Sequence, residues 1–242
     1  MILTIHKTIN FVLIKHKIMN NYPVSELNKV KRGAKRASYN VEEVHTILDA
    51  GFVGFVSYIF NNQTMSIPMA YGRIDDKIYL HGSKKNRMLL ALLENKKASM
   101  TVMHLDGLVL ARSGFHHSVN YRSVTLFGLV NQINEPAMKE RALKCIVDQM
   151  IPDRWDNIRP MNEKEFNGTL VVEMTIETAS AKIRNEGVVD EKSDVELPIW
   201  AGVVPIKQVA EFPESDHLLH ESIKIPEHVL RYYKDHKFKL RA

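Results

Sequence analysis

The stretch from Lys77 to Glu94 combines residue types that suit the binding of an anion. Its middle reads His81-Gly-Ser-Lys-Lys-Asn-Arg87, where an alternating strand pattern changes to the apolar helical pattern of Met88–Leu93. A helix start presents unpaired N–H groups and the positive end of the helix dipole, and Ser83 is expected to cap it. Together with the basic side chains of the turn, this layout suits a phosphate group. A surface turn with solvated lysines is the competing interpretation.

Other well-known catalytic and metal-binding motifs are missing from the sequence. Cys145 is the single cysteine, which excludes an intramolecular disulfide and a cysteine metal cluster, and its spacing places it on the buried face of a helix. The motifs His-Glu-x-x-His, Gly-x-Ser-x-Gly and Gly-x-Gly-x-x-Gly are absent, which disfavours a zinc enzyme, a serine hydrolase and a Rossmann cofactor site. No metal site is expected, and a reducing, cytoplasmic compartment is the default for such a chain.

The composition indicates a globular protein with a substantial core. The 242 residues allow one large or two small domains, and 45% of them are hydrophobic. The net charge of +5 is spread along the chain, so neither a nucleic-acid nor a membrane partner is expected. The basic run Lys29–Arg36 either contacts phosphates or forms a solvated arm. In Met1–Ile18 the uncharged segment Thr8–Ile14 is too short for a membrane span or signal core, and we expect Met19 to be the biological start.

Periodicity predicts a mainly β protein with flanking helices. Helices are expected from Asn40, as the N-cap, to Gly51, at Ser83–Asn95 and at Ala137–Ile151. Strands are expected at Phe52–Ile59, Met65–Tyr71, Lys77–His81, Ala98–His104, Leu108–Arg112, Ser123–Gln132 and Leu170–Glu177, with hairpin turns at Asn61-Asn62 and Asp75-Asp76.

Tightly joined strands with few helices favour an antiparallel barrel over a doubly wound sheet. We expect an N-terminal extension at 1–29, a barrel at 30–210 and a polar tail at 211–242 with a short helix at Glu227–Asp235. The acidic segment Asn185–Glu196 is expected to be a loop, and Pro198–Ile206 an extended element.

Several motifs in register resemble the pyridoxamine 5′-phosphate oxidase-like split barrels, in the flavin-nucleotide-binding branch that includes the nitroimidazole-resistance reductases. The matching segments are Ile67–Gly72, Tyr79–Leu89, Asp106–Val124, Pro152–Asp156, Ala179–Arg184 and Leu197–Gly202. The resemblance runs from about Val30 to Ile206. It implies a homodimeric split β-barrel that binds FMN at the subunit interface.

The resemblance also implies roles for individual residues. The FMN phosphate would be held by Ser83, Asn86 and Arg87, with the backbone of His81, Gly82 and Lys84 nearby. The edge of the isoalloxazine ring would lie along Pro68, Met69, Ala70 and Tyr71.

The segment from His116 to Ser123 would approach the flavin, so His117 or Tyr121 would lie over the ring or donate a proton to the substrate. A turn with exposed imidazoles is the alternative. Arg122, beside Ser123, would either reach the phosphate or form a structural ion pair, and Trp200 would either cover the flavin or belong to the core.

The function that this resemblance implies is an FMN-dependent oxidoreductase. NADH or NADPH would reduce the flavin, and a small acceptor such as a nitroaromatic compound or a quinone would reoxidise it. A haem-binding or haem-handling protein on the same barrel is a second hypothesis, with His81, His116 and His117 as possible axial ligands. A non-enzymatic flavin carrier or redox sensor is a third.

Overall fold

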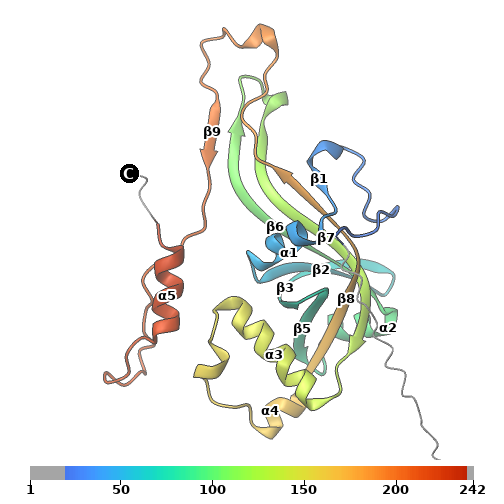
Figure 1. Ribbon diagram of the computed structural model, residues 1–242, viewed down its shortest axis with the longest axis vertical. Helices are drawn as coiled ribbons and strands as arrows, with labels where there is room; N and C mark the ends of the chain where they lie inside the picture. The colour runs from blue at the N-terminus through green and yellow to red at the C-terminus, as the bar shows by residue number, and fades with distance from the viewer. Residues whose placement is uncertain (1–19, 239–242) are drawn as a thin grey trace, which may run out of the picture.

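A single antiparallel sheet forms the body of the protein in the computed structural model, which describes residues 20–238 (Figure 1). The expected extension 1–18 and the expected start at Met19 lie outside the described residues. The strands of this nine-stranded sheet are β1 (Ala37–Ser38), β2 (Val53–Phe60), β3 (Gln63–Ala70), β4 (Gly72–Ile74), β5 (Lys77–Ser83), β6 (Lys97–Leu110), β7 (Ser118–Gln132), β8 (Thr169–Arg184) and β9 (Gly202–Pro205).

The order of the strands explains why the sheet curls into a barrel. The order is β3-β2-β6-β7-β8-β5-β4, with β1 paired to β8 and β9 paired to β6. The two strands at the ends of this path, β3 and β4, are consecutive in sequence and are separated only by Tyr71. The sheet must therefore bend until its ends meet at that residue. The expected mainly β split barrel is confirmed.

Within the described residues, five helices and four short 3₁₀ turns accompany the sheet. They are α1 (Val41–Asp49), α2 (Arg87–Asn95), α3 (Pro136–Met150), α4 (Glu163–Gly168) and α5 (Glu227–His236), with short 3₁₀ turns η1 (Ala34–Arg36), η2 (Gly114–His116), η3 (Trp155–Asn157) and η4 (Lys192–Asp194). Buried side chains of α1 and α2 share the main core with the inner faces of the strands, while α3 packs on a second cluster around Tyr79 and Val171.

Most of the expected elements are confirmed, and the differences have local causes. Both expected turns exist, with positive φ at Asn61, Asn62 and Asp75, although the second joins β4 to β5. The strands expected at 98–104 and 108–112 are one strand, β6, whose register shifts at Asp106. The expected cap at Ser83 is wrong, because Ser83 ends β5 and helix α2 begins later, at Arg87.

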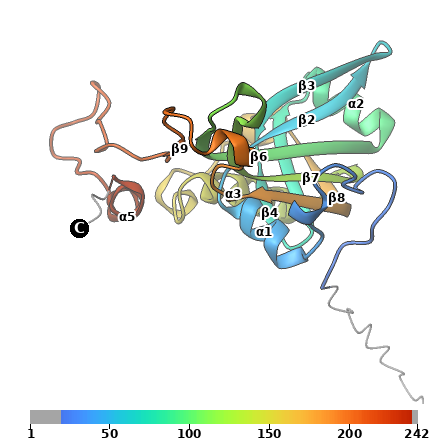
Figure 2. The same ribbon diagram turned by 90° about the horizontal axis from the view of Figure 1, so that it is seen from above.

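The far halves of β6 and β7 extend beyond the barrel and form, with η2 and β9, a projection that we call the wing (residues 105–121 and 198–206) (Figure 1). The loop after β8 is tied to it by the Arg112–Asp190 ion pair at 2.7 Å. Beyond β9 the chain leaves the barrel, and both views show α5 at the end of a long arm (Figure 2). An ion pair between Arg231 and Asp153 connects α5 to the body.

Candidate cofactor site

The turn between β5 and α2 is held by its own backbone. The N–H of Lys84 donates to Gly168 O at 3.2 Å, that of Lys85 to Ser83 Oγ at 3.2 Å, and that of Asn86 to Ser83 O at 2.8 Å. Gly82 allows the chain to approach itself here, since a Cβ would lie 3.0 Å from Asn86 Nδ2. These N–H groups of the turn are therefore already engaged within the protein.

The groups whose geometry suits an anion lie instead at the first turn of α2. Asn86 is the N-cap, and its side-chain oxygen accepts from Leu89 N at 3.1 Å. Within the described residues, the N–H groups of Arg87 and Met88 at the start of the helix donate to no protein acceptor. Unpaired N–H groups at a helix start attract a phosphate. Within the described residues the Ser83 hydroxyl only accepts, from Lys85 N, and its hydrogen has no acceptor there.

Arg87 is exposed and available to a ligand. Its guanidinium carbon lies 4.7 Å from the centre of the Phe60 ring, which holds the side chain next to the β2–β3 hairpin. Among residues 20–238 it makes no ion pair. The structure thus brings Ser83, Asn86 and Arg87 together at one helix start.

The segment Pro68–Tyr71 lies at the end of the strand order, in β3 and the corner that follows. Within the described sheet β3 pairs only with β2, so backbone groups along its other edge have no strand partner. This edge has free main-chain donors and acceptors, which the polar edge of an isoalloxazine ring would need. Tyr71 itself is fully buried, and its hydroxyl donates to Leu48 O at 2.5 Å. Its side chain therefore serves the fold.

Strand register places several expected site residues on one surface, the outer face of the barrel. Residues directly opposite each other in adjacent strands project to the same side of a sheet. Pro68 pairs with Phe55, Phe55 with Thr101, and Thr101 with Thr125. Ser123 and Tyr121 follow Thr125 at two-residue steps, so they share this face with Pro68.

Arg122 projects to the opposite side of β7. Its guanidinium forms two hydrogen bonds of 2.9 Å with the carboxylate of Asp106. The hydrogen bond to Asp106 raises the pKa of Arg122 above its ordinary value. In this structure Arg122 is therefore engaged in an ion pair across the strands.

Three of the remaining predicted residues, His116, His117 and Trp200, lie on the wing, whereas His81 lies just before the turn. His117 Nδ1 donates to Ser113 O at 2.8 Å, and His116 Nε2 lies 3.4 Å from Glu191. Trp200 is 67% exposed on the wing rather than part of the core. His81 lies on β5 with a buried Nδ1 that has no partner within the described residues, and burial lowers its pKa, which favours the neutral imidazole.

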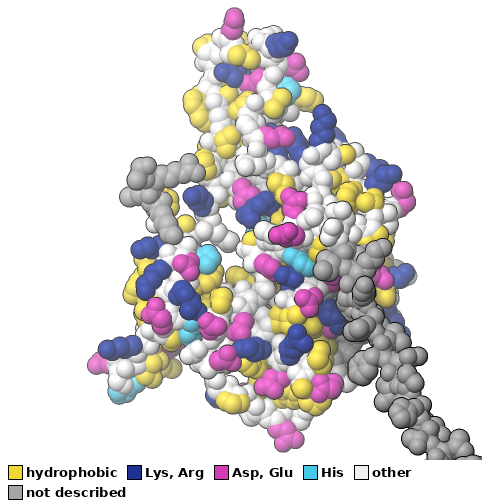
Figure 3. Space-filling view, viewed as in Figure 1, with side chains coloured by type: hydrophobic (Ala, Val, Ile, Leu, Met, Phe, Trp, Pro, Cys, Tyr) yellow, Lys and Arg dark blue, Asp and Glu magenta, His cyan; other side chains and the backbone are white. Residues whose placement is uncertain are grey.

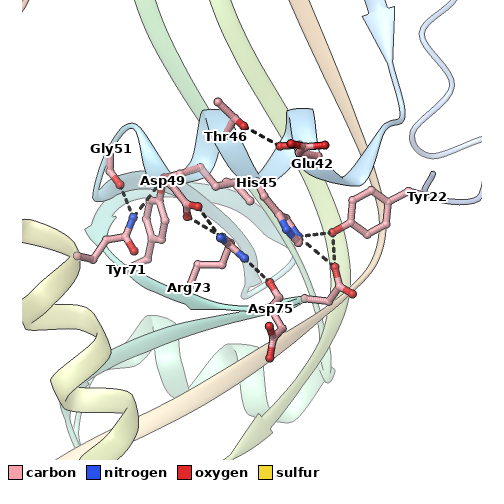
Figure 4. A network of polar contacts seen from close by, with 12 residues as sticks. Tyr22, Glu42, His45, Thr46, Asp49, Gly51, Tyr71, Arg73 and Asp75 are labelled. Carbon is pink, nitrogen blue, oxygen red and sulfur yellow. Dashed lines mark hydrogen bonds and ion pairs between the residues drawn. The ribbon is translucent and has the colours of Figure 1, made fainter. Parts of the chain in front are cut away.

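A polar network that the sequence did not predict fastens the N-terminal segment to the barrel (Figure 4). The hydroxyl of Tyr22 donates to Asp76 Oδ1 at 2.5 Å and lies 3.1 Å from His45 Nε2, which is itself 3.2 Å from Asp76. Arg73 pairs with Asp49 beside it. These residues come from separate segments with no shared motif, so no sequence signal marks them as neighbours.

A curled antiparallel sheet whose end strands meet at Tyr71 is the architecture of the split-barrel class. The family model for pyridoxamine 5′-phosphate oxidase matches residues 40–183, and the chain belongs to this family. The predicted family is therefore confirmed. A comparison with curated proteins finds no significant match.

Solved structures include two with substantial sequence identity to this chain. The flavocytochrome Anf3 from Azotobacter vinelandii is 36% identical with a TM-score of 0.81, covering 86% of this chain and 97% of its own. The FAD and haem binding protein from Mycobacterium smegmatis is 30% identical with a TM-score of 0.77, covering 81% and 97%. A proposed 5-nitroimidazole antibiotic resistance protein from Bacteroides thetaiotaomicron shares the fold, at 18% identity and a TM-score of 0.51, covering 61% and 86%.

Proposed function

We propose that this protein is a redox flavoprotein that also binds haem. The observation that carries the proposal is the identity of 36% and 30%, over more than four-fifths of the chain, to a flavocytochrome and to a protein that binds FAD and haem. The more distant nitroimidazole-resistance likeness supports the fold alone. The haem hypothesis and the flavin hypothesis thus become parts of one function.

The start of α2 fits the phosphate of a flavin nucleotide. Arg87 would pair with the phosphate oxygens, Ser83 would donate its hydroxyl, and the free N–H groups of the first turn would complete the shell. The ring would lie along the edge of β3 at Pro68–Ala70, towards Ser123. FMN is the cofactor expected from the sequence, and FAD contains the same unit with a second nucleotide. The relative that binds FAD leads us to propose FAD as the bound form.

The wing and the outer face fit a second, apolar cofactor. Their exposed side chains are mostly apolar, and histidines lie at the wing's end. A haem needs an apolar surface for its macrocycle and an imidazole or other ligand for its iron. Within residues 20–238, no cluster of three or more His, Cys, Asp and Glu residues forms a separate metal site.

A bound flavin would supply hydride and single-electron chemistry, with NADH or NADPH as the electron donor. The electron acceptor would be haem or a small molecule such as a nitroaromatic compound or a quinone. The chain's part is to hold the flavin and to exclude water. Tyr121 is the proposed proton donor on this face. It lies opposite Arg184 in the strand register.

We also propose a homodimer, in which a second copy covers the outer face. Phe55 is 50% exposed and Met103 is 56% exposed on this face, and a groove of about 480 Å³ beside them is lined by Ser57, Ile59 and Phe127. Exposed apolar surface of this kind marks an interface. Light scattering that shows only monomers at micromolar concentration would rule the dimer out.

One absorption spectrum of the purified protein, with chromatography of the flavin released by heat, tests the proposed function. We expect flavin bands, a Soret band and released FAD. A preparation that shows neither flavin bands nor a Soret band after incubation with FAD, FMN and haem and removal of the unbound cofactors refutes the proposal, and released FMN refutes only the choice of nucleotide. Oxidation of NADH or NADPH then separates an enzyme from a flavin carrier or sensor.

Within the described residues, no helix is long and apolar enough to cross a membrane.

A further inference from the structure

One side of the wing is apolar and open to solvent. Val119 of β7 pairs with Leu108 of β6, and Leu108 pairs with Val204 of β9, so these three side chains form a row across the strands. Their exposed fractions are 39%, 36% and 40%. Hydrophobic side chains are visible on the wing, at the upper end of Figure 3. A row of this kind in the middle of a small sheet is a surface for a flat apolar ligand.

Trp200 adds an aromatic ring to this side of the wing. A Cβ built on Gly202 would lie 2.8 Å from the Trp200 ring, so the indole covers the position where the side chain of residue 202 would project. Gly202 and Val204 are two residues apart on β9 and therefore share a face. The indole thus lies on the same side as the apolar row.

His117 lies directly before β7, and among residues 20–238 its Nδ1 is hydrogen-bonded while its Nε2 has no partner. Its backbone, with φ of −59° and ψ of 141°, leads directly into β7, and it lies two residues before Val119 of the apolar row. Its Nδ1 is 2.8 Å from the carbonyl oxygen of Ser113. Only an N–H can pair with a carbonyl, so Nδ1 carries the proton and Nε2 has the lone pair. Metal-binding histidines are oriented in this way.

The other two candidate histidines, His116 and His81, are not oriented to bind a metal in this way. His116 Nε2 faces the carboxylate of Glu191 at 3.4 Å, and its ring packs edge-on against Phe115 at 5.2 Å between centroids. His81 lies in β5, on another part of the barrel, with its Nδ1 buried. Among these candidates, His117 alone combines an oriented ring, an exposed position and an apolar surface beside it.

We infer that the haem of the proposed function lies on this side of the wing, with His117 Nε2 as an axial ligand of its iron and Trp200, Val119 and Leu108 against the macrocycle. The inference rests on the proposed function, because that proposal supplies the haem. It places both cofactors on one continuous face. Ser123, in β7, is six residues along the chain from His117, a distance of about 20 Å where the chain is extended.

The test is a titration of the full-length protein and its variants with hemin, in which the absorbance of the Soret band reports binding. The released flavin is measured in parallel. In His117→Ala we expect hemin affinity to fall by at least about 10–100-fold, the effect of losing even an outer partner of a metal ligand. The flavin content should not change, and added imidazole should restore the Soret position. His117→Met keeps a ligand, so it should bind hemin with an altered spectrum. His116→Ala is the matched control and should resemble the wild type.

Two results would overturn the inference. One is a His117→Ala variant that binds hemin with wild-type affinity and an unchanged Soret band. The other is loss of the Soret band in His81→Ala while His117→Ala retains it. These outcomes are distinct from failure of the proposed function, in which the wild-type protein itself gives no Soret band. Circular dichroism and flavin content show whether each variant is folded, and His117→Met serves if His117→Ala is not.

Discussion

The substitution Arg87→Ala tests the flavin site most directly. Arg87 is exposed and, within residues 20–238, has no acidic partner, so its main contact in the protein is the stacking on Phe60 at 4.7 Å. Losing a cation–π contact at an exposed site costs about 0.5–1 kcal/mol of folding free energy. Losing a charge-assisted hydrogen bond to the phosphate costs about 1.5–3 kcal/mol of binding free energy, which is about 10–150-fold in Kd. Binding should therefore suffer more than stability.

The assay is a titration of flavin-free protein with FAD, FMN and riboflavin, followed by flavin fluorescence. Riboflavin has no phosphate, so Arg87→Ala should weaken FMN and FAD binding and leave riboflavin binding unchanged. Lys85→Ala is a control in the same turn, because Lys85 is exposed and its N–H bond to Ser83 does not depend on its side chain. It should produce only the small, salt-sensitive change of a screened surface charge. Equal losses for FMN and riboflavin, or no loss for FMN, would refute the assignment of Arg87 to the phosphate.

Three further substitutions test the framework around the site. Tyr22→Phe removes a hydrogen bond to the half-exposed carboxylate of Asp76 and should lower the free energy of unfolding, measured in urea, by about 1–2 kcal/mol. If the free-energy losses of Tyr22→Phe and Asp76→Asn add fully in the double variant, the two side chains are not coupled. Burial lowers the pKa of His45, so the unfolded chain takes up a proton more readily. Stability should therefore fall as the pH drops below about 6.5 and less steeply in His45→Gln, and identical pH profiles would contradict this. Gly72→Ala puts a Cβ 2.6 Å from Cys145 Sγ and 2.7 Å from the Cys145 carbonyl carbon, so it should cost about 1–3 kcal/mol by displacing α3; a wild-type melting temperature would count against that packing.

The strands of the barrel could be predicted because their alternation is regular, and the exceptions are bulges. The strand expected at Leu170–Glu177 continues to Arg184 as β8. The register shifts at Glu177, so that Phe127 pairs with Thr178 and Gly128 with Ile176. An extra residue reverses which positions face inwards. The pattern after Glu177 therefore looks like the end of a strand, although pairing continues.

The start of α2 could not be located from residue types alone. Ser83 and Asn86 are both good N-cap residues and lie three positions apart. Ser83 pairs with Thr169 on β8, which keeps it extended, and only then does the chain turn into the helix. The choice depends on a strand that lies far along the sequence. Propensity correctly predicted the turn and the helix, while sheet pairing set the boundary.

The contact that the Arg122 side chain makes also depends on a residue distant in the sequence. Alternation along β7 predicts that Arg122 faces away from Tyr121 and Ser123, and the structure agrees. The partner that receives its guanidinium, Asp106, is the residue at which the register of β6 shifts. Sequence spacing does not reveal such a shift, so both a phosphate contact and a structural ion pair stayed open for Arg122.

The same irregularity at Asp106 joins the two proposed cofactor surfaces. Leu105 pairs with Tyr121 and Leu108 pairs with Val119, so two residues three apart on β6 oppose two residues that are two apart on β7. In a regular strand, positions three apart face opposite sides. Because the shift resets the alternation, Leu108 stays on the side of Leu105, and the apolar outer face of the barrel continues onto the wing. Without it, the row that leads towards His117 would be interrupted at the point where the barrel ends.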